Sequence, residues 1–421
     1  MVLAFTLLGV ALMLLSVPLF IVFGVSSAAI AVWGLNLPSH TLMQVSFDAV
    51  SKQVLVAIPV FVFAGNIMYH GGSARRLVDL GVTAVGHLPG GLGLAMILSI
   101  AIFSAISGSI LASIVAIGSV LMKPMVEAGY PKPFVIVLAA TAALMDALIP
   151  PSNTAIIYSA ITHVPVSKAF AAGVFPGLVL GLLLLVYVMW TCRGMRRPAP
   201  SSWRARARAF LVALPGLVLP VLILGGLYGG LLTPAESASL ASVYALVLGV
   251  FVYRELTWSG FWKATRATAE TTAVIFAIIA MAVYFSIVMT YTRTPQAIVQ
   301  FFIEYNIGPV TFLALAGIAI IILGTFMEAV PVFYLTLPIM YPVVTALKID
   351  PLLFYVFITG LIGLGLITPP VCVGLYTAAA ILRTPPQQAF SAVPGFFMVG
   401  ILYAVIVVAF PWLATWLPKY W

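Results

Sequence analysis

The chain has 421 residues, of which 63% are hydrophobic and only 7% are charged; its mean hydropathy is +1.20 and its net charge is +9. Because a soluble protein carries about 25% charged residues, this composition excludes a soluble globular fold and indicates an integral membrane protein. A helical crossing needs about 20 apolar residues, so the chain has room for roughly ten to twelve crossings.

The apolar runs are continuous, as in 211–227 and 396–413. A transmembrane β-barrel needs strands of about ten residues in which polar and apolar side chains alternate, so we expect an all-α fold. The first run, residues 1–24, is too long for the core of a signal peptide and has no basic start. It predicts a transmembrane helix that is retained in the mature protein.

Two apolar blocks in the first half of the chain are unusual. Residues 91–127 are longer than one span and are interrupted by small and polar residues at 104–109, so we expect a re-entrant helical hairpin. Residues 133–163 are interrupted by Pro150-Pro151. Because proline removes a backbone hydrogen-bond donor, this block predicts a broken helix, and unwound backbone at membrane depth occurs only inside protein or against a water-filled cavity.

A short arginine-rich segment, residues 191–208, separates the two halves. Positive residues beside spanning helices mark the cytoplasmic side and attract anionic lipid. We therefore attribute the net positive charge to membrane topology and lipid contact rather than to nucleic acid binding. The six arginines of this linker are Arg193, Arg196, Arg197, Arg204, Arg206 and Arg208.

The second half repeats both unusual blocks. A second hairpin is expected over 309–346, and a second broken helix, interrupted by Pro369-Pro370, is expected over 351–382. Ala169-Phe170 and Ala389-Phe390 match at nearly the same offset in residue number as the two Pro-Pro pairs. This regular spacing indicates an internal duplication.

The two repeats are expected to be inverted relative to each other. Residues 1–190 form the first repeat and 209–421 the second, with the cytoplasmic linker between them. Counting crossings outward from this linker places most lysines and arginines on the cytoplasmic side. The same count makes the two hairpins enter the membrane from opposite sides.

Paired broken helices in inverted repeats are typical of secondary transporters, whose substrate and coupling-ion sites lie near the bilayer midplane. Positive half-helix ends suit an anionic substrate, and freed carbonyl and hydroxyl groups suit a small cation. Serine and glycine at these positions also permit close helix packing, which is the alternative. The first-half candidates are Ser104, Ser107, Gly108, Ser109, Asp146, Ile149, Pro150, Pro151, Ser152, Asn153 and Thr154, with Ser152 expected to cap a helix. The second-half candidates are Gly324, Thr325, Met327, Glu328, Gly363, Gly365, Thr368, Pro369, Pro370 and Val371.

Asp146 and Glu328 are acids within apolar segments. A charge at the centre of a spanning helix costs about 2.5–3.5 kcal/mol on insertion scales, so such residues are functional by default. Asp146 aligns with Gly365. It is either a residue beside a cation site or a structural acid. Glu328 follows the second hairpin tip and is either a site residue or a helix cap. Glu236 belongs instead to a capping box that begins at Thr233.

Several stretches resemble the large membrane subunit of tripartite ATP-independent periplasmic (TRAP) transporters. They include SAISGS at 104–109, LIPPSNT at 148–154 and GLITPPV at 365–371, and the resemblance covers essentially the whole chain. It implies an elevator-type subunit of the bacterial inner membrane that imports an organic anion with a sodium gradient. It also implies two partners, a small four-helix membrane subunit and a soluble periplasmic substrate-binding protein.

The same resemblance implies two sodium sites and a substrate site, with no organic cofactor. Where the family usually has glycine, this chain has Asp146, and the carboxylate either strengthens the first sodium site or carries a proton. The implied first sodium site comprises Ser107, Gly108, Asp146, Ile149 and Pro150, and the second comprises Thr325, Met327, Gly365, Thr368 and Pro369. The implied substrate site comprises Ser109, Ser152, Asn153, Thr154, Glu328 and Val371.

Other functions remain open at this point. A stand-alone sodium- or proton-coupled di- or tricarboxylate symporter of the same superfamily would need no soluble protein. An intramembrane hydrolase would need one of the hairpin serines and a histidine such as His163, although two symmetric sites do not suit hydrolysis. A structural scaffold would leave the repeated breaks unexplained, so we expect a transporter and not an enzyme. No Walker motif occurs in the sequence.

Overall fold

The computed structural model describes residues 9, 11–12, 17–38, 40–195 and 199–420. These residues form helices, and no strand occurs among them, so the all-α fold is confirmed. Eight of the described helices are long and apolar enough to span a membrane, or up to nine if a bent pair is counted as one span. This number is lower than the ten to twelve expected, because part of the apolar length lies in shorter helices. Most of residues 1–18, which belong to the expected first helix, lie outside the described residues, as do Arg196 and Arg197.

In the first half, α2 leads directly into a π-helical turn. Its elements are α2 (Leu19–Ala29), the π-helical η1 (Ile30–Gly34), α3 (His40–Val50), the 3-10 turn η2 (Gln53–Val56), α4 (Ala57–His70), α5 (Ser73–Val85), α6 (Gly91–Ser107), α7 (Ile110–Glu127), α8 (Lys132–Ala142), α9 (Met145–Leu148), α10 (Asn153–Thr162) and α11 (Val166–Thr191).

The second half begins after the arginine-rich linker. Its elements are α12 (Trp203–Tyr228), α13 (Pro234–Val247), the π-helical η3 (Leu248–Val252), α14 (Trp258–Tyr291), α15 (Thr294–Glu304), α16 (Pro309–Gly324), α17 (Ala329–Ala346), α18 (Pro351–Ile367), α19 (Val373–Ile381), the 3-10 turn η4 (Pro386–Ala392), α20 (Val393–Ala409), α21 (Trp412–Thr415) and the 3-10 turn η5 (Leu417–Tyr420).

Several helix starts follow from local capping chemistry. The Thr233 hydroxyl accepts a hydrogen bond from the backbone N–H of Glu236, whose carboxylate accepts one from the backbone N–H of Thr233, so the predicted capping box is confirmed. The Asp350 carboxylate accepts hydrogen bonds from the first-turn N–H groups of α18, and Ser202 caps α12 in the same way. These side chains satisfy N–H groups that have no partner inside the helix.

The elements of the two halves correspond in order and in spacing. α7 begins at Ile110 and α17 at Ala329, which is the same offset in residue number as that between the Pro-Pro pairs, and each helix has 18 residues. The starts of η1 and η3, and those of α10 and α19, follow this offset closely. The spacing predicted from the Pro-Pro pairs therefore extends to elements that carry no proline. The inversion of the two halves across the membrane stays a prediction.

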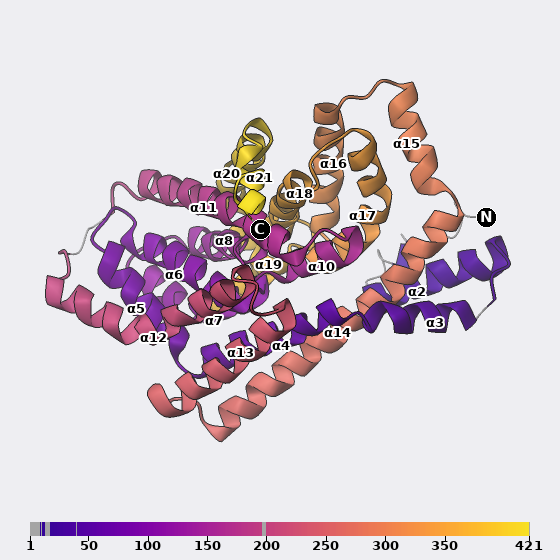
Figure 1. The fold of residues 1–421 in the computed structure, drawn as a ribbon. Helices are drawn as coiled ribbons and strands as arrows, with labels where there is room; N and C mark the ends of the chain where they lie inside the picture. The colour runs from indigo at the N-terminus through magenta and orange to yellow at the C-terminus, as the bar shows by residue number, and fades with distance from the viewer. Residues whose placement is uncertain (1–8, 10, 13–16, 39, 196–198, 421) are drawn as a thin grey trace.

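The halves differ where α14 lies. α14 is one continuous helix of 34 residues, whereas the corresponding stretch of the first half is divided into α3, η2 and α4. In Figure 1, α14 runs diagonally along the lower edge of the molecule, with α3 and α4 beside it. α14 packs against α2, α3 and α4 of the first half and against α17 of the second. One helix of the second half thus supports several helices of the first.

The hairpins and broken helices pack together across the two halves. α7 contacts α19, α10 contacts α17, and α8 contacts α18. The first hairpin turns at Gly108, whose φ of +59° favours glycine. A Cβ atom there would lie 2.6 Å from the Pro151 carbonyl oxygen, so the hairpin tip touches the first Pro-Pro break. α8–α9 and α10 meet at this break with a bend of 45°.

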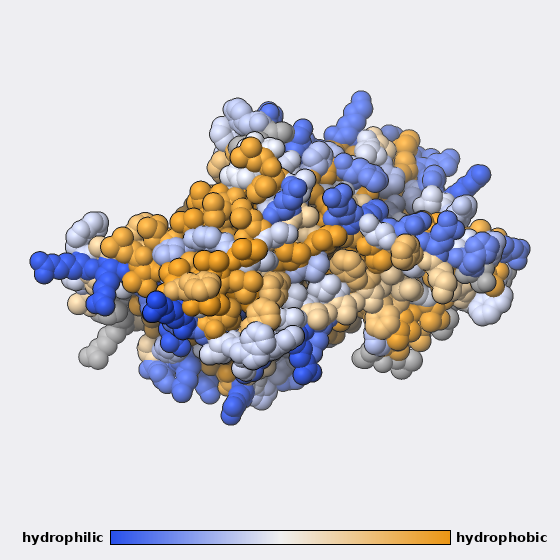
Figure 2. Space-filling model, turned by 60° about the horizontal axis from the view of Figure 1, so that its bottom comes forward, coloured by the Kyte–Doolittle hydropathy of each residue, from blue (hydrophilic) through white to orange (hydrophobic). Residues whose placement is uncertain are grey.

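Apolar side chains also cover much of the molecular surface. Figure 2 shows a broad hydrophobic area on one face, with hydrophilic residues concentrated toward its margins. Leu211 and Val221 of α12 and Val243 of α13 are examples of large exposed hydrophobic residues. Such faces are stable in contact with lipid tails, as expected for spanning helices.

Candidate functional site

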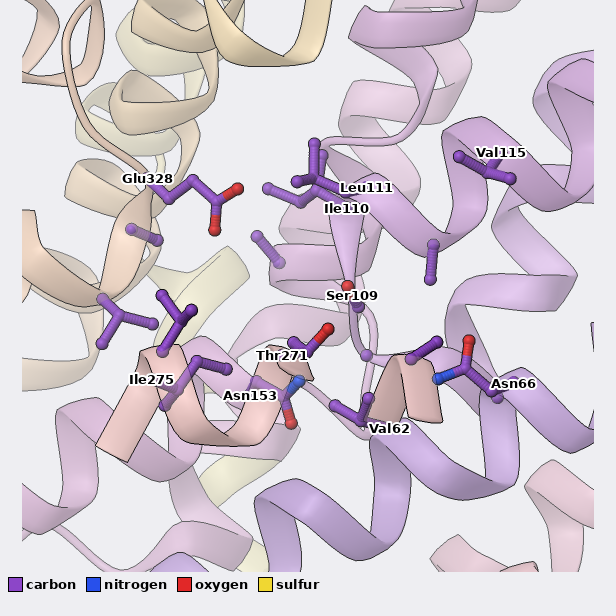
Figure 3. A pocket seen from close by; sticks show the side chains of 18 of the residues that line it. Val62, Asn66, Ser109, Ile110, Leu111, Val115, Asn153, Thr271, Ile275 and Glu328 are labelled. Atoms are coloured by element: carbon purple, nitrogen blue, oxygen red, sulfur yellow. The ribbon is translucent and has the colours of Figure 1, made fainter. Parts of the chain in front are cut away.

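A cavity of about 580 Å³ lies where the hairpin tips face two long helices. One wall is formed by the starts of α7, α10 and α17, and the opposite wall by α4 and α14. Figure 3 shows Ser109, Asn153 and Glu328 around this space, with Asn66 and Thr271 on the α4 and α14 side. The cavity therefore separates the elements that carry the chain breaks from the elements that do not.

Three helix N-termini meet at the first wall. Their first-turn N–H groups carry partial positive charge, and together they favour a negatively charged group in the cavity. Asn153, at the start of α10, adds a polar side chain that is 8% exposed and whose Oδ1 atom has no hydrogen-bond partner. Because a buried amide oxygen without a partner is costly, this side chain is suited to contact a ligand.

Ser152 and Glu328 do not cap their helices. Ser152 lies at the N-cap position of α10, but its hydroxyl donates to the Ala147 carbonyl oxygen (2.7 Å) instead of accepting from the helix. Glu328 lies at the N-cap position of α17 and makes no side-chain cap hydrogen bond. Ser152 therefore occupies the predicted N-cap position, but its hydroxyl accepts no backbone hydrogen bond from the first turn of α10, so the expected cap is absent. The capping alternative for Glu328 is wrong as well, because its carboxylate accepts no hydrogen bond from the first turn of α17.

The charges on the cavity wall are acidic. Glu328 points toward the space in Figure 3, and its carboxylate has no hydrogen bond or ion pair with any described residue. Glu270 also lines the cavity and is paired with Arg266 at 2.7 Å. Among the described residues that line the cavity, none is lysine or arginine, and His70 is the only histidine. An anion in this space would therefore meet Glu328 with no lysine or arginine side chain among the described lining residues to offset the repulsion.

Asp146 and two serines form a polar group behind the first hairpin tip. The Ser107 hydroxyl donates to Asp146 Oδ1 at 2.8 Å and lies 3.1 Å from the Ser113 hydroxyl. Asp146 is fully buried, and its Oδ2 atom has no partner. A buried carboxylate oxygen without a partner is stabilised by a cation or by a proton. Ser107 and Asp146 therefore fit either a small cation such as sodium or a proton.

The other predicted members of the first sodium site lie close to this group. Gly108 lines the cavity, and its carbonyl oxygen accepts a hydrogen bond from the backbone N–H of Asn153 (3.4 Å). Pro150 is buried and Ile149 is partly exposed. The hairpin tip and the first break are thus joined through backbone, and both stay candidates for cation ligands.

The second predicted sodium site is built differently. The hydroxyls of Thr325 and Thr368 donate to carbonyl oxygens about one turn earlier, at 2.7 and 2.6 Å respectively. Gly365 packs so closely on α16 that a Cβ atom there would overlap the Gly324 backbone and lie 2.8 Å from the Ile321 carbonyl oxygen. Thr325 accepts a hydrogen bond at its carbonyl oxygen from the N–H of Cys372 (3.0 Å). This site offers no unpartnered side-chain oxygen among the described residues.

The structure brings only some of the predicted substrate residues to the cavity. Ser109, Asn153, Thr154 and Glu328 line it. Ser152 lies behind the wall against Ala147. Val371 is exposed and does not line the cavity. Two members of the predicted second sodium site, the exposed Pro369 and the buried Met327, do not line it either.

Sequence reasoning missed the second wall and one serine. Asn66, Glu270 and Thr271 line the cavity from α4 and α14, and Ser113 lies beside Ser107. The α14 residues that line the cavity recur at 267, 270, 271, 274 and 275, which is the spacing of one helix face. This periodicity is visible in the sequence, but only the fold shows that this face meets the hairpins.

Comparison with known proteins agrees with this architecture. Residues 6–413 match the family model described as "Tripartite ATP-independent periplasmic transporter, DctM component". The chain is 36% identical over 379 residues to the C4-dicarboxylate TRAP transporter large permease protein DctM of Pseudomonas aeruginosa, covering 89% of this chain and 88% of that protein. It is 33% identical over 383 residues to the ectoine/5-hydroxyectoine TRAP transporter large permease protein UehC of Ruegeria pomeroyi, covering 90% and 89%.

A solved structure shares the fold. The YdaH transporter of Alcanivorax borkumensis matches with a TM-score of 0.63 over 97% of this chain and 99% of that chain, at 15% identity. The family match covers nearly the whole chain, and the apolar helices agree with a multi-pass protein of the bacterial inner membrane. The chain belongs to the DctM family, the large permease subunits of tripartite ATP-independent periplasmic transporters.

Proposed function

We propose that this permease subunit carries a carboxylate-bearing organic anion across the inner membrane by an elevator movement driven by a sodium gradient. The observation that carries the proposal is the cavity in which three helix N-termini meet with no lysine or arginine among the described lining residues. Helix N-termini bind anions through backbone N–H groups without a fixed positive charge. Such a site suits reversible binding during transport rather than catalysis.

The acidic residues support coupling to a cation. A carboxylate substrate in the cavity meets the unpaired carboxylate of Glu328, and this repulsion is strong where water is scarce. A sodium ion held by Ser107 and Asp146 behind the hairpin tip would offset it. Anion and cation then bind more tightly together than either binds alone, which is the linkage that symport requires.

The position of the cavity supports an elevator movement. The hairpins and broken helices lie on one side of it, and α4 and α14 lie on the other. A movement of the first group against the second would expose the cavity to the opposite side of the membrane. Lys52, between α3 and η2, donates to the Ala160 carbonyl oxygen near the end of α10 (3.0 Å). This contact joins the two groups and must break during such a movement.

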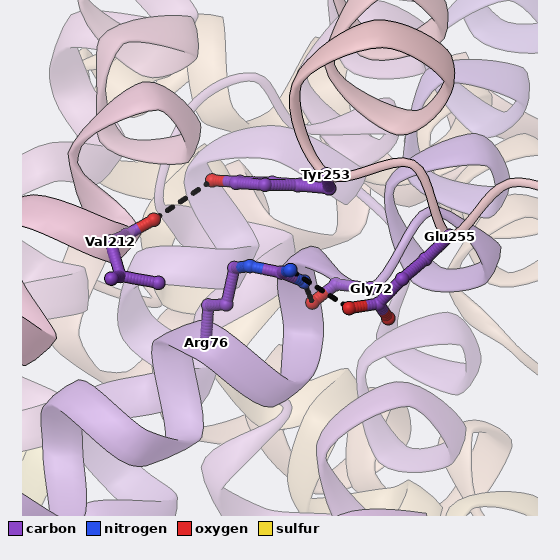
Figure 4. A network of polar contacts seen from close by, with 5 residues as sticks. All are labelled: Gly72, Arg76, Val212, Tyr253 and Glu255. Carbon is purple, nitrogen blue, oxygen red and sulfur yellow. Dashed lines mark hydrogen bonds and ion pairs between the residues drawn. The ribbon is translucent and has the colours of Figure 1, made fainter.

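The helix that leads into the first hairpin is anchored to the second half. Arg76 of α5 forms an ion pair with Glu255 (2.8 Å) and lies 3.9 Å above the ring centre of Tyr253. Tyr253 donates to the Val212 carbonyl oxygen of α12, as Figure 4 shows. The Arg76 guanidinium also donates to the Gly72 carbonyl oxygen. These contacts tie α5 to the second half, while α5 also packs against α6 and α7 of the first hairpin.

The family supports two partners, a small four-helix membrane subunit and a soluble periplasmic protein that delivers the substrate. Relatives of this chain carry names that refer to substrates as different as C4-dicarboxylates and ectoine. The substrate is therefore best identified through the soluble partner. The alternative is a stand-alone symporter, which would transport its substrate without a soluble protein.

The test is uptake into liposomes that contain this chain and the small membrane subunit. The ligand is first identified by screening carboxylates against the soluble substrate-binding protein of the same transporter. We expect uptake only when an inward sodium gradient and the loaded soluble protein are both present. Uptake without the soluble protein would favour the stand-alone symporter, and uptake that is indifferent to sodium would refute sodium coupling.

A further inference from the structure

The fully buried Tyr355 of α18 reaches from the second half into the first broken helix. Its hydroxyl donates to the Ala147 carbonyl oxygen at 3.0 Å and lies 3.3 Å from the Thr154 hydroxyl. Ala147 and Thr154 both line the cavity, on either side of the Pro-Pro break. Tyr355 itself does not line the cavity, so any effect on a ligand passes through these two residues.

Three hydroxyl groups converge on the Ala147 carbonyl oxygen. Ser152 and Thr154 each lie 2.7 Å from it, and their hydroxyl oxygens are 2.6 Å apart. A carbonyl oxygen accepts through two lone pairs, so the three hydroxyls share their protons as one network. Loss of the Tyr355 hydroxyl leaves the oxygen with the two donors that lie within the broken helix itself. The side chain of Thr154 then loses the one hydroxyl partner that the described residues outside that helix give it.

The same carbonyl lies next to the acidic residue of the first site. Ala147 directly follows Asp146, whose carboxylate accepts the hydrogen bond from Ser107. A shift of the Ala147 peptide therefore moves the acid as well as the cavity wall. The residue that corresponds to Tyr355 in the first half, at the offset that relates the two Pro-Pro pairs, is Ile136, which has no hydroxyl. A residue of the second half therefore contacts the first break, and the corresponding residue of the first half cannot make the same contact with the second break.

We propose that Tyr355 is a positioning residue that holds the first broken helix, through Ala147 and Thr154, in the shape that binds cation and substrate. The proposal rests on the proposed function of the cavity. Gly365 of the second break lies near the C-terminal end of α18, and Thr368 directly follows the last residue of this helix. Movement of α18 at the second break is thereby transmitted to the first.

Tyr355→Phe is the direct test, because it removes the hydroxyl and retains the ring, which packs 5.0 Å from the ring of Tyr158. The matched control is Tyr403→Phe. Tyr403 is also buried and its hydroxyl also donates to a carbonyl oxygen, that of Val356 (3.0 Å), but it does not reach the cavity wall. Both variants lose one buried hydroxyl, so a purely structural role affects them alike.

The first readout is the sodium concentration that gives half of the sodium-induced rise in Tm of the purified full chain, with choline chloride replacing sodium at constant ionic strength. We expect Tyr355→Phe to raise this concentration about three- to tenfold, the value of one hydrogen bond, and Tyr403→Phe to leave it within about twofold. Thr154→Val removes the hydroxyl that lies beside the Tyr355 hydroxyl. In the Thr154→Val background, Tyr355→Phe should therefore raise the half-maximal sodium concentration by a smaller factor. Equal behaviour of the two tyrosine variants would overturn the proposal.

The second readout does not depend on sodium coupling. Asn153→Cys, in a chain whose buried Cys192 and Cys372 are replaced by alanine, reports the shape of the cavity wall through its rate of reaction with a water-soluble thiol reagent. We expect Tyr355→Phe to change this rate at least about threefold relative to Tyr403→Phe. Equal rates would overturn the positioning role. If the parent chain shows no response to sodium, the proposed coupling fails, but the labelling rates still decide the role of Tyr355.

Discussion

The two chain breaks share a backbone plan but differ in chemistry. In both halves an N–H group just after the Pro-Pro pair donates to a carbonyl oxygen at the hairpin tip, from Asn153 to Gly108 and from Cys372 to Thr325. The side chains around this common feature are polar in the first half and mostly apolar or absent in the second. At the offset that relates the two Pro-Pro pairs, Ser107, Ser113, Asp146, Ser152 and Thr154 correspond to Phe326, Val332, Gly365, Val371 and Val373.

The two breaks also differ in exposure. Pro150 and Pro151 are buried, whereas Pro369 and Pro370 are exposed. A duplicated backbone can therefore supply two broken helices while the side chains make the sites unequal. The first break has the carboxyl group of Asp146 beside it, whereas the second has close glycine packing and backbone oxygens. We expect cation coupling to depend on the charge of the Asp146 carboxyl at the first site and on the close backbone packing of Gly365 at the second.

The largest effect is expected for Gly365→Ala. The added methyl group would overlap the Gly324 backbone, so α16 and α18 must separate. We expect the free energy of unfolding to fall by about 3 kcal/mol, the upper range for overpacking, as measured by denaturation of the purified chain. Gly225→Ala is the control, because a Cβ atom there has nothing within 4 Å. Similar stability of the two variants would show that the second site is not held by shape.

Asp146→Asn tests the charge of the first site. The amide can still accept from Ser107, but it removes the negative charge that favours a cation. We expect the sodium concentration for half-maximal stabilisation to rise about tenfold or more, which corresponds to about 1.4 kcal/mol. Asp350→Asn is the control, since this acid caps α18 away from the cavity. An unchanged sodium dependence would mean that Asp146 is a structural acid.

Glu328→Gln should act in the opposite direction. It removes an unpaired negative charge from the cavity wall, so we expect the transported anion to bind about two- to fivefold more tightly at a fixed sodium concentration. The measurement is the half-saturating anion concentration for uptake into liposomes. Glu270→Gln, which affects an acid already paired with Arg266, should change it less. Weaker anion binding in Glu328→Gln would show that the carboxylate contacts the substrate favourably.

The smallest effect is expected at α5, the counterpart of α15. Glu255→Gln weakens the partly exposed ion pair with Arg76, so we expect a loss of at most about 1 kcal/mol in the free energy of unfolding. Glu304→Gln on α15 has no ion-pair partner among the described residues and should leave stability unchanged. The two variants are compared by denaturation at low and high salt, because screening should reduce the difference. A loss in Glu304→Gln as large as in Glu255→Gln would contradict the anchoring of α5.

Much of this architecture was predictable because its signals are local. The continuous apolar runs determine an all-helical membrane protein, and the Pro-Pro pairs determine where helices end, since proline lacks the N–H group that would continue them. The offset between these pairs also relates the starts of α7 and α17 and of α10 and α19, but not the continuous α14, whose counterpart in the first half is divided into α3, η2 and α4. The short helices α3, α5 and α15 were missed, because their mixed composition resembles that of loops.

Only the tertiary structure decided which of these features meet. Tyr355 and Thr154 are 201 positions apart, and no local pattern indicates that their hydroxyl groups are neighbours. Ser152 leaves the N-terminus of α10 uncapped because its hydroxyl donates instead to the Ala147 carbonyl oxygen on the other side of the Pro-Pro pair. Helix faces and breaks follow from the order of residues along the chain, whereas a cavity forms only where faces from distant segments pack with space between them.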